Sequence, residues 1–110
     1  MSMQRCCPPT AVDGTDRTRE AALFKALADP HRLAILATLA RAEHDVCVCD
    51  LADGLPLGQP TVSHHLRLLR DAGLIAGERR GTWVYYRLLP DAQERLEAAL
   101  ASTLPRKARC

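Results

Sequence analysis

An amphipathic helix is encoded by the stretch QPTVSHHLRLLR, residues 59–70. Its apolar residues Val62, Leu66 and Leu69 recur at a spacing that places them on one face of a helix. Gly73 follows and is expected to end the helix, because glycine readily adopts the left-handed conformation common at helix C-termini. We therefore predict a helix with an inward apolar stripe and an outward polar face.

The outward face of this helix carries small polar and basic side chains that suit contact with DNA. The residues LPLG at 55–58 predict a tight turn before it, and a short helix is expected at residues 49–54. Two short helices joined in this way form a helix-turn-helix, whose second helix enters the major groove. The residues expected to contact base edges or nearby phosphates are Gln59, Thr61, Ser63, His64 and Arg67.

Two further helices are predicted upstream of the helix-turn-helix. The first covers residues 18–28, with apolar positions at Ala22, Leu23, Ala26 and Leu27. Asp29 is expected to cap the second helix, with Pro30 in its first turn and an end near Ala42. The predicted buried stripe of the second helix is Leu33, Leu36, Leu39 and Ala40.

A β-hairpin and a last helix complete the predicted fold. Residues 74–76 and 83–88 are β-prone and are separated by a basic tip, Arg79-Arg80-Gly81. A helix after Pro90 carries a stripe that could serve self-association, namely Ala92, Leu96, Ala99 and Leu100. The prediction is a mainly α fold with a small β-hairpin, a dimeric winged helix-turn-helix in the order α-α-α-α-β-β-α. Residues 18–104 form this domain, between a flexible arm at 1–17 and a basic tail at 105–110.

Positive charge is concentrated where DNA contact is expected. Residues 59–87 hold five arginines and two acidic residues, a net charge of +3, whereas the whole chain carries only +2. So small a total excludes a polybasic condenser of nucleic acid. We expect Arg79 and Arg80 at the hairpin tip to contact phosphate, the alternative for any single arginine being an ordinary solvated surface charge.

Composition bounds the class of protein further. With 110 residues, of which 47% are hydrophobic, the chain suits one compact core. It lacks a signal-peptide pattern and any run of about 18 apolar residues, so a cytoplasmic protein without membrane contact is expected. Five cysteines, an odd number, in a reducing compartment favour free thiols over disulfides. No phosphate-binding loop, Cys-x-x-Cys pair or pair of carboxylates suggests an enzyme.

Four segments together resemble the ArsR/SmtB family of metal-responsive repressors. They are ALADPHRL at 26–33, QPTVSHHL at 59–66, LRDAGLI at 69–75 and WVYY at 83–86. The resemblance covers residues 19–104, with the helices, turn and wing in the family's order. It implies a homodimer, joined through the first and last helices, that represses transcription by binding double-stranded operator DNA.

Cys47-Val48-Cys49-Asp50 resembles the segment that arsenic- and cadmium-responsive members carry at the start of the helix-turn-helix. The alternative is a pair of buried small side chains, but thiolates prefer soft ions, which favours ligands. On a regular helix Cys47 and Cys49 would point about 200° apart, whereas in an extended segment they would point the same way. A shared ion is therefore expected to unwind the helix start and weaken DNA binding.

The resemblance implies three thiolates for arsenic, and Ala52 stands where such members carry a third cysteine. Cys6 and Cys7 are expected to complete the site, since about ten flexible residues span about 33 Å; some members join such arm cysteines to the partner protomer's Cys-Val-Cys pair. Three thiolates suit As(III) or Sb(III) as inducer, whereas four suit Cd(II), Pb(II) or Zn(II). A thiol redox sensor is the other alternative. The last helix lacks histidine, so the zinc-sensing branch's site is not expected there. Cys110 is expected to be a disordered terminal residue, the alternative being a fifth thiol near the site.

Overall fold

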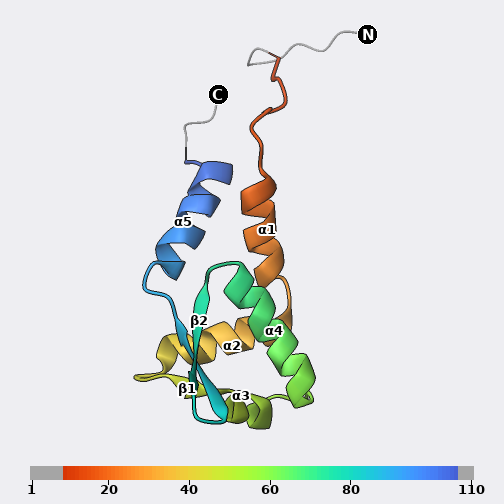
Figure 1. Ribbon diagram of the computed structural model, residues 1–110. Coiled ribbons are helices and arrows are strands. Elements are labelled where there is room, and N and C mark those ends of the chain that lie inside the picture. The colour runs from red at the N-terminus through yellow and green to blue at the C-terminus, as the bar shows by residue number, and fades with distance from the viewer. Residues whose placement is uncertain (1–8, 107–110) are drawn as a thin grey trace.

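The Asp29-Pro30 corner separates the first two helices and fixes where the second begins. In the computed structural model, which describes residues 9–106, α1 is Thr18–Leu27 and α2 is Pro30–Arg41 (Figure 1). The Asp29 Oδ2 atom accepts hydrogen bonds from the backbone N–H groups of His31 at 2.9 Å and Arg32 at 3.0 Å. The carboxylate thus satisfies donors that have no partner within the helix. The predicted cap is confirmed.

The helix-turn-helix consists of α3, Val48–Gly54, and α4, Gln59–Asp71. The two helices pack against each other, and Figure 1 shows α3 beside the end of α4 that is farther from α1. Val62, Leu66 and Leu69 are fully buried, as their spacing predicted. Gly73 follows α4 with a φ of 76°, which confirms the expected helix end.

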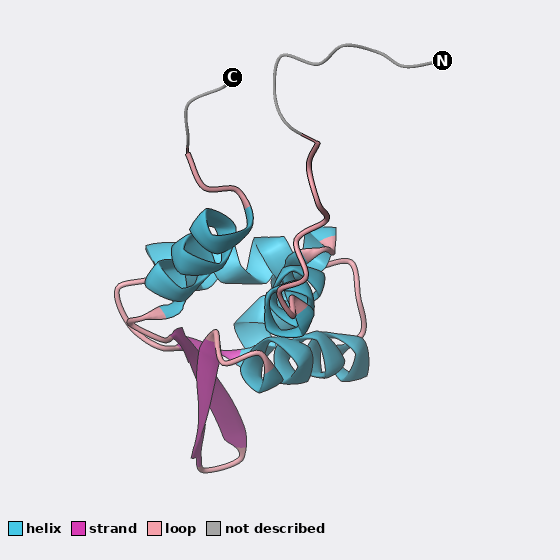
Figure 2. Ribbon diagram, turned by 90° about the horizontal axis from the view of Figure 1, so that it is seen from above, coloured by secondary structure: helices cyan, strands magenta, loops and turns pink. Residues whose placement is uncertain are grey.

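A small antiparallel sheet forms the wing. Its strands are β1, Val46–Cys47; β2, Ile75–Arg80; and β3, Trp83–Leu88, in the order β1-β3-β2. Figure 2 shows the β2–β3 hairpin extending away from the helices. The hairpin is confirmed, but its turn lies at Gly81, whose φ is 66°, while Arg79 and Arg80 belong to β2. Strand β1 was not predicted, because two residues are too short to show an alternating pattern.

Gly77 lies in the middle of β2, opposite Tyr86 of β3. A Cβ atom at residue 77 would lie 2.9 Å from Cε1 of the Tyr86 ring. That distance is shorter than a van der Waals contact between carbon atoms. The glycine is therefore needed so that the buried tyrosine ring can lie across the strand.

Helix α5, Ala92–Thr103, returns the chain to α1. Figure 1 shows these two helices side by side at the end of the molecule away from α3. Arg17 connects them, because its Nη1 donates to Ser102 Oγ at 2.8 Å and to Glu20 Oε2 at 3.3 Å. In the described part of the chain, no helix is long and apolar enough to cross a membrane.

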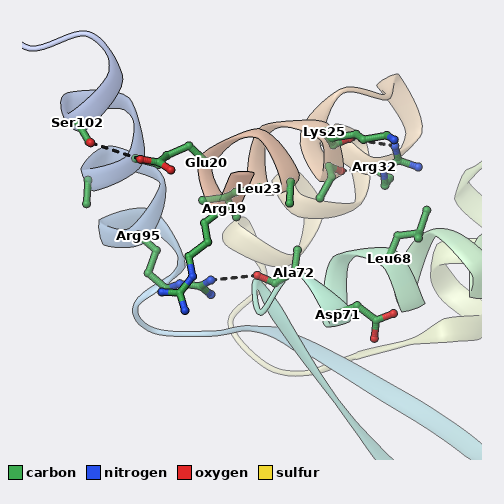
Figure 3. Close-up of a pocket in the computed structure, with 14 residues that line it drawn as sticks. Arg19, Glu20, Leu23, Lys25, Arg32, Leu68, Asp71, Ala72, Arg95 and Ser102 are labelled. Atoms are coloured by element: carbon green, nitrogen blue, oxygen red, sulfur yellow. Dashed lines mark hydrogen bonds between the residues drawn. The ribbon is translucent and has the colours of Figure 1, made fainter. Parts of the chain in front are cut away.

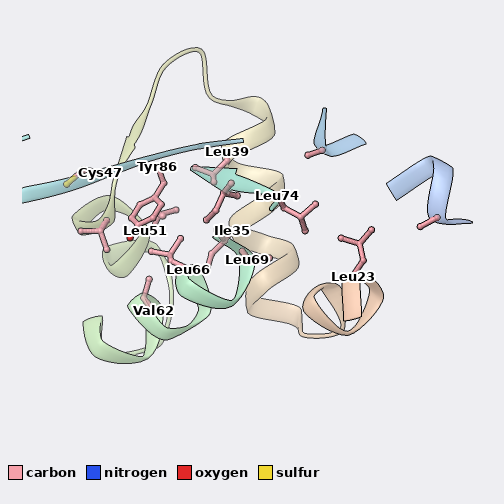
Figure 4. Close-up of a cluster of buried hydrophobic side chains, with 14 residues drawn as sticks. Leu23, Ile35, Leu39, Cys47, Leu51, Val62, Leu66, Leu69, Leu74 and Tyr86 are labelled. Atoms are coloured by element: carbon pink, nitrogen blue, oxygen red, sulfur yellow. The ribbon is translucent and has the colours of Figure 1, made fainter. Parts of the chain in front are cut away.

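The core lies where α2, α3, α4 and the sheet meet (Figure 4). Its most buried large side chains are Ile35, Val62, Leu66, Leu69, Leu74 and Ile75. The predicted stripe of α2 is wrong at Leu33, which is 52% exposed, and at Ala40, while Ile35 is buried instead. Eight of the twelve residues of α2 are apolar and they lie all round the helix, so their spacing alone could not identify the inward face.

The first prediction concerns the Asp29 cap. Backbone hydrogen bonds from Arg32 and then His31 hold the pKa of Asp29 below its ordinary value of 3.8. A carboxylate whose pKa falls on folding stabilises the fold above its unfolded pKa, and this contribution is lost as the pH falls through the folded value. Asp29→Ala should therefore lower the thermal midpoint at pH 7, and the difference from the parent should shrink below about pH 4.

Thermal unfolding followed by circular dichroism from pH 7 to pH 3 measures this difference. The control is Glu43→Ala, which removes an exposed carboxylate from the loop after α2. A gap between parent and Asp29→Ala that stays constant across this pH range would show that the charge of the cap does not matter.

Candidate nucleic-acid interface and thiol pair

The polar face of α4 lies in solvent, opposite the buried stripe. Each side chain predicted to contact DNA from this helix is exposed: Gln59, Thr61, Ser63, His64 and Arg67. Gly58 precedes the helix with extended backbone, and Pro60 lies in its first turn. The first N–H groups of such a helix have no helical partner and can face a phosphate. The arrangement therefore presents both polar side chains and a helix N-terminus on one surface.

A hydrogen-bonded network connects α4 to the corner between α1 and α2. The Arg32 guanidinium donates from Nε to the Ala26 carbonyl at 2.7 Å and from Nη2 to the Lys25 carbonyl at 3.3 Å. Its Nη1 lies 3.1 Å from Nδ1 of His65 on α4. Because arginine only donates, His65 Nδ1 acts as the acceptor. His65 therefore positions α4, whereas the neighbouring His64 faces solvent.

The wing carries the other predicted phosphate contacts. Arg79 and Arg80 are both exposed residues of β2. The Arg80 Nη2 atom lies 2.5 Å from Asp45 Oδ2 and 3.4 Å from Glu78 Oε2. Glu78 also lies 4.0 Å from Arg87, so part of the local positive charge is neutralised in the folded protein. A charge count along residues 59–87 missed Asp45, because it lies outside that stretch.

Cys47 and Cys49 are brought together at the junction of β1 and α3. Cys47 is extended, with φ −67° and ψ 141°, and caps α3, while Cys49 lies in the first helical turn. The backbone N–H of Cys49 donates to Cys47 Sγ at 3.3 Å, and the two sulfur atoms are joined as a disulfide. Cys47 is buried, whereas Cys49 is partly exposed. The pair is therefore a convergent thiol site with one accessible side.

This geometry corrects three expectations. Helix α3 begins at Val48 rather than at residue 49, and Cys47 and Cys49 meet without any loss of helix. One extended and one helical residue point the two sulfurs to the same place, so unwinding is not needed for sharing an ion. The cysteines are also paired with each other, whereas free thiols were expected.

The rest of the predicted thiol site lies outside the described residues. Cys6, Cys7 and Cys110 belong to the segments 1–8 and 107–110. Within residues 9–106, no group of three or more His, Cys, Asp or Glu residues is arranged to hold a metal ion. The described part of the chain thus contributes two cysteine sulfur atoms to the predicted site.

An open groove of about 970 Å³ lies between α1, α4 and α5 (Figure 3). Leu23, Ala26, Leu68 and Ala99 provide its apolar lining. Arg95 projects from α5 and donates to the Ala72 carbonyl at 3.1 Å, which fastens α5 to the end of α4. The groove is on the face of the molecule that carries both α1 and α5, and away from the thiol pair.

The helix order, the paired helices α3 and α4 and the sheet behind them define a winged helix-turn-helix regulator. The sequence profile described as "Bacterial regulatory protein, arsR family" matches residues 29–76. With the relatives described next, this match shows that the chain belongs to the ArsR family. The family consists of regulators rather than enzymes, in agreement with the sequence prediction.

Three curated relatives share this region. The chain is 45% identical over 78 residues to "Arsenic resistance transcriptional regulator ArsR1" of Pseudomonas putida, covering 71% of this chain and 60% of that protein. It is 44% identical over 73 residues to "Uncharacterized HTH-type transcriptional regulator MJ1325" of Methanocaldococcus jannaschii, covering 66% of this chain and 81% of that protein. It is 48% identical over 68 residues to the "Arsenical resistance operon repressor" of Escherichia coli, covering 62% and 57%. The chain thus spans less than two thirds of both arsenic-resistance proteins.

A solved structure agrees with the fold. The crystal structure of "ArsR family transcriptional regulator, RHA00566" superposes with a TM-score of 0.69 at 29% identity. The superposition covers 77% of this chain and 91% of that one. The predicted winged helix-turn-helix is confirmed.

The second prediction tests the Arg32 network. Arg32→Ala removes donors from the carbonyls of Ala26 and Lys25 and from His65, so the free energy of unfolding should fall by about 1–3 kcal/mol. Arg32→Lys should not restore it, because an ammonium group lacks the planar set of donors that reaches all three acceptors. Urea denaturation measures both, with Arg41→Ala at the exposed end of α2 as control. Full recovery by lysine would show that only the charge matters.

Proposed function

We propose that the protein is a metalloid-responsive transcriptional repressor, which binds operator DNA as a homodimer and dissociates when trivalent arsenic or antimony binds its cysteine thiolates. The observation that carries the proposal is the convergence of Cys47 and Cys49 at the first turn of α3, beside the helix proposed to read DNA. Relatives named for arsenic resistance support the choice of ion.

The thiol pair fits a soft ion in its reduced form. Thiolate sulfur is the protein ligand that soft ions prefer, and the two sulfurs already lie together. A third ligand for As(III) or Sb(III) has to come from outside residues 9–106, and Cys6 and Cys7 are the proposed donors. With both arm cysteines the site would hold four thiolates, and Cd(II), Pb(II) or Zn(II) becomes the alternative inducer.

The position of the pair offers a route from the ion to DNA. Val48 and Leu51 of α3 are buried in the same core as Val62 and Leu66 of α4. Cys47 also pairs in register with Tyr85 of the wing strand β3. A ligand that shifts the β1–α3 junction therefore acts on α4 and on the wing together. The loss of DNA affinity would be set by how much more tightly the ion binds the shifted arrangement of this junction than the arrangement that binds DNA.

Dimerisation is proposed through α1 and α5. Leu100 of α5 is 52% exposed and Leu104, just after this helix, is 69% exposed, while other residues of α5 line the groove. Exposed apolar side chains around a groove favour burial against a second copy. Figure 1 shows α1 and α5 side by side, away from α3.

A thiol redox sensor is the second candidate, favoured by the bonded sulfurs of Cys47 and Cys49. In that reaction two thiols form one disulfide while one peroxide is reduced to two waters, which balances protons and electrons. The resulting bond would act at the same β1–α3 junction. The two candidates thus share their site but differ in their chemical signal.

The third prediction tests the thiol site. In the reduced protein, Cys47→Ser and Cys49→Ser should keep affinity for an operator selected from a random duplex pool, yet fail to release it on arsenite addition, because serine is a poor ligand for a soft ion. Fluorescence anisotropy of the labelled duplex measures release. The double variant at Cys6 and Cys7 should also fail, whereas Cys110→Ser should behave like the parent.

Parallel titrations separate the alternatives. Arsenite, Cd(II) and peroxide are added in turn while thiolate-to-metal absorption and free thiols are measured. Release by peroxide alone would replace the metalloid proposal with redox sensing. If the Cys6/Cys7 double variant releases DNA at the same arsenite concentration as the parent, the arm cysteines are not part of the ion site.

The fourth prediction concerns sequence reading by α4. Ser63→Ala should reduce the preference for operator over random DNA, since a lost base contact costs about 1–3 kcal/mol of discrimination. Competition binding with the two duplexes measures this, and Glu43→Ala in the exposed loop after α2 serves as the control. If Ser63→Ala weakens both complexes equally, Ser63 contacts the DNA backbone instead.

A further inference from the structure

Arg80 of the wing is held by groups from its own strand and from the loop before β1. Its Nη2 lies 2.5 Å from Asp45 Oδ2, and Glu78 approaches the same nitrogen at 3.4 Å. Its guanidinium carbon also lies 4.7 Å from the centre of the Tyr85 ring. The Arg80 side chain is 47% exposed, whereas that of Asp45 is 19% exposed. The arginine is thus available to solvent while its carboxylate partner is largely covered.

The same contacts lead back to the thiol pair. Asp45 is two residues before Cys47, and Cys47 is the register partner of Tyr85 in the sheet. Tyr85 is in turn the register partner of Glu78 in β2. Residues directly opposite in antiparallel strands project from the same face of a sheet. One face therefore carries a continuous set of contacts from Cys47 through Tyr85 to Arg80, with Asp45 at its edge.

We propose that Asp45 is a latch on the wing, which competes with DNA phosphate for Arg80 and whose hold is strengthened when an ion is bound by Cys47 and Cys49. DNA binding then requires Arg80 to exchange the Asp45 carboxylate for a phosphate oxygen. Both partners are anionic oxygens and both accept from the same guanidinium, so one replaces the other. An ion at Cys47 fixes the segment that carries Asp45 and opposes that exchange.

The ion pair between Arg80 and Asp45 contributes little to the stability of the fold. Although Asp45 is largely covered, nearly half of the Arg80 side chain is exposed, so solvent screens the pair and its contribution to stability is small. A weak pair is nevertheless suited to a switch, since a phosphate can displace it. Removal of Asp45 should consequently alter DNA binding much more than it alters unfolding.

The competition between Asp45 and phosphate for Arg80 does not require a bound ion. The coupling of Asp45 to the thiol pair, in contrast, rests on the proposed function. The test therefore uses the full-length reduced protein and the selected operator, first without any ion and then with arsenite. Asp45→Asn is compared with Glu43→Gln, which removes an exposed carboxylate from the same loop. Arg80→Ala and the double variant Asp45→Asn/Arg80→Ala complete a double-mutant cycle, which measures how far the effect of Asp45 depends on Arg80.

Without ion, Asp45→Asn should tighten operator binding by about two- to fivefold, the range of exposed ion pairs. In the Arg80→Ala background the same change should have no effect. Salt titrations should show a slope steeper by up to about one in Asp45→Asn, because the Asp45 carboxylate freed in the parent takes up a counterion and offsets the one released from the phosphate. If Glu43→Gln tightens operator binding equally, or if Asp45→Asn still tightens it in the Arg80→Ala background, the effect comes from net charge alone. Either result would overturn the proposed latch.

With arsenite, the fold-loss of DNA affinity should be smaller in Asp45→Asn than in the parent, while urea midpoints stay equal. An identical loss in both proteins would overturn the coupling between Asp45 and the thiol pair. If the parent itself releases no DNA, the metalloid proposal fails, and the ion-free cycle still decides whether Asp45 restrains Arg80.

Discussion

Burial of one side of α4 is the contact on which the other features depend. Val62, Leu66 and Leu69 are completely removed from solvent, and they hold α4 against α2, α3 and the base of the wing. Each large aliphatic side chain contributes about 1.5–3 kcal/mol when fully buried. Because this stripe determines the rotation of the helix about its axis, it also determines that Ser63 and Arg67 face outward.

The junction of β1 and α3 joins two kinds of secondary structure within a few residues. Cys47 ends a strand, pairs with Tyr85 and accepts a hydrogen bond from the N–H of Cys49 inside the helix. A change at this point is transmitted to the helix-turn-helix by packing and to the wing by backbone pairing. The chain belongs to the ArsR family of regulators, and the junction is the place where the proposed ion binding would act on DNA binding.

Strong local signals made most of the fold predictable from the sequence. Asp29 before Pro30, the spacing of Val62, Leu66 and Leu69, and Gly73 after α4 each correspond to a feature found in the structure. The inward face of α2 could not be identified, because its apolar residues surround the helix. Strand β1 and the pairing of Arg80 with Asp45 depend on contacts between distant segments, which no local pattern reports.

For the candidate-site residues within 9–106, the sequence predicted which side chains of α4 are exposed but not the geometry around them. The polar face of α4 followed directly from the apolar stripe. For Cys47 and Cys49, helical and extended conformations were considered separately, whereas the protein uses one of each. The role of His65 was also missed, because its acceptor function depends on Arg32 from another helix. Spacing along the chain carries no information about such a partner.

The close approach of Gly77 and Tyr86 has a consequence for how the wing can diverge among related proteins. A side chain at residue 77 and a large ring at residue 86 compete for the same volume, since even a methyl group would lie 2.9 Å from the ring. The two positions should therefore vary together, with a larger residue in β2 accompanied by a smaller one in β3. Tip residues such as Thr82 are free of this restriction, so the end of the hairpin can change while its base keeps its shape.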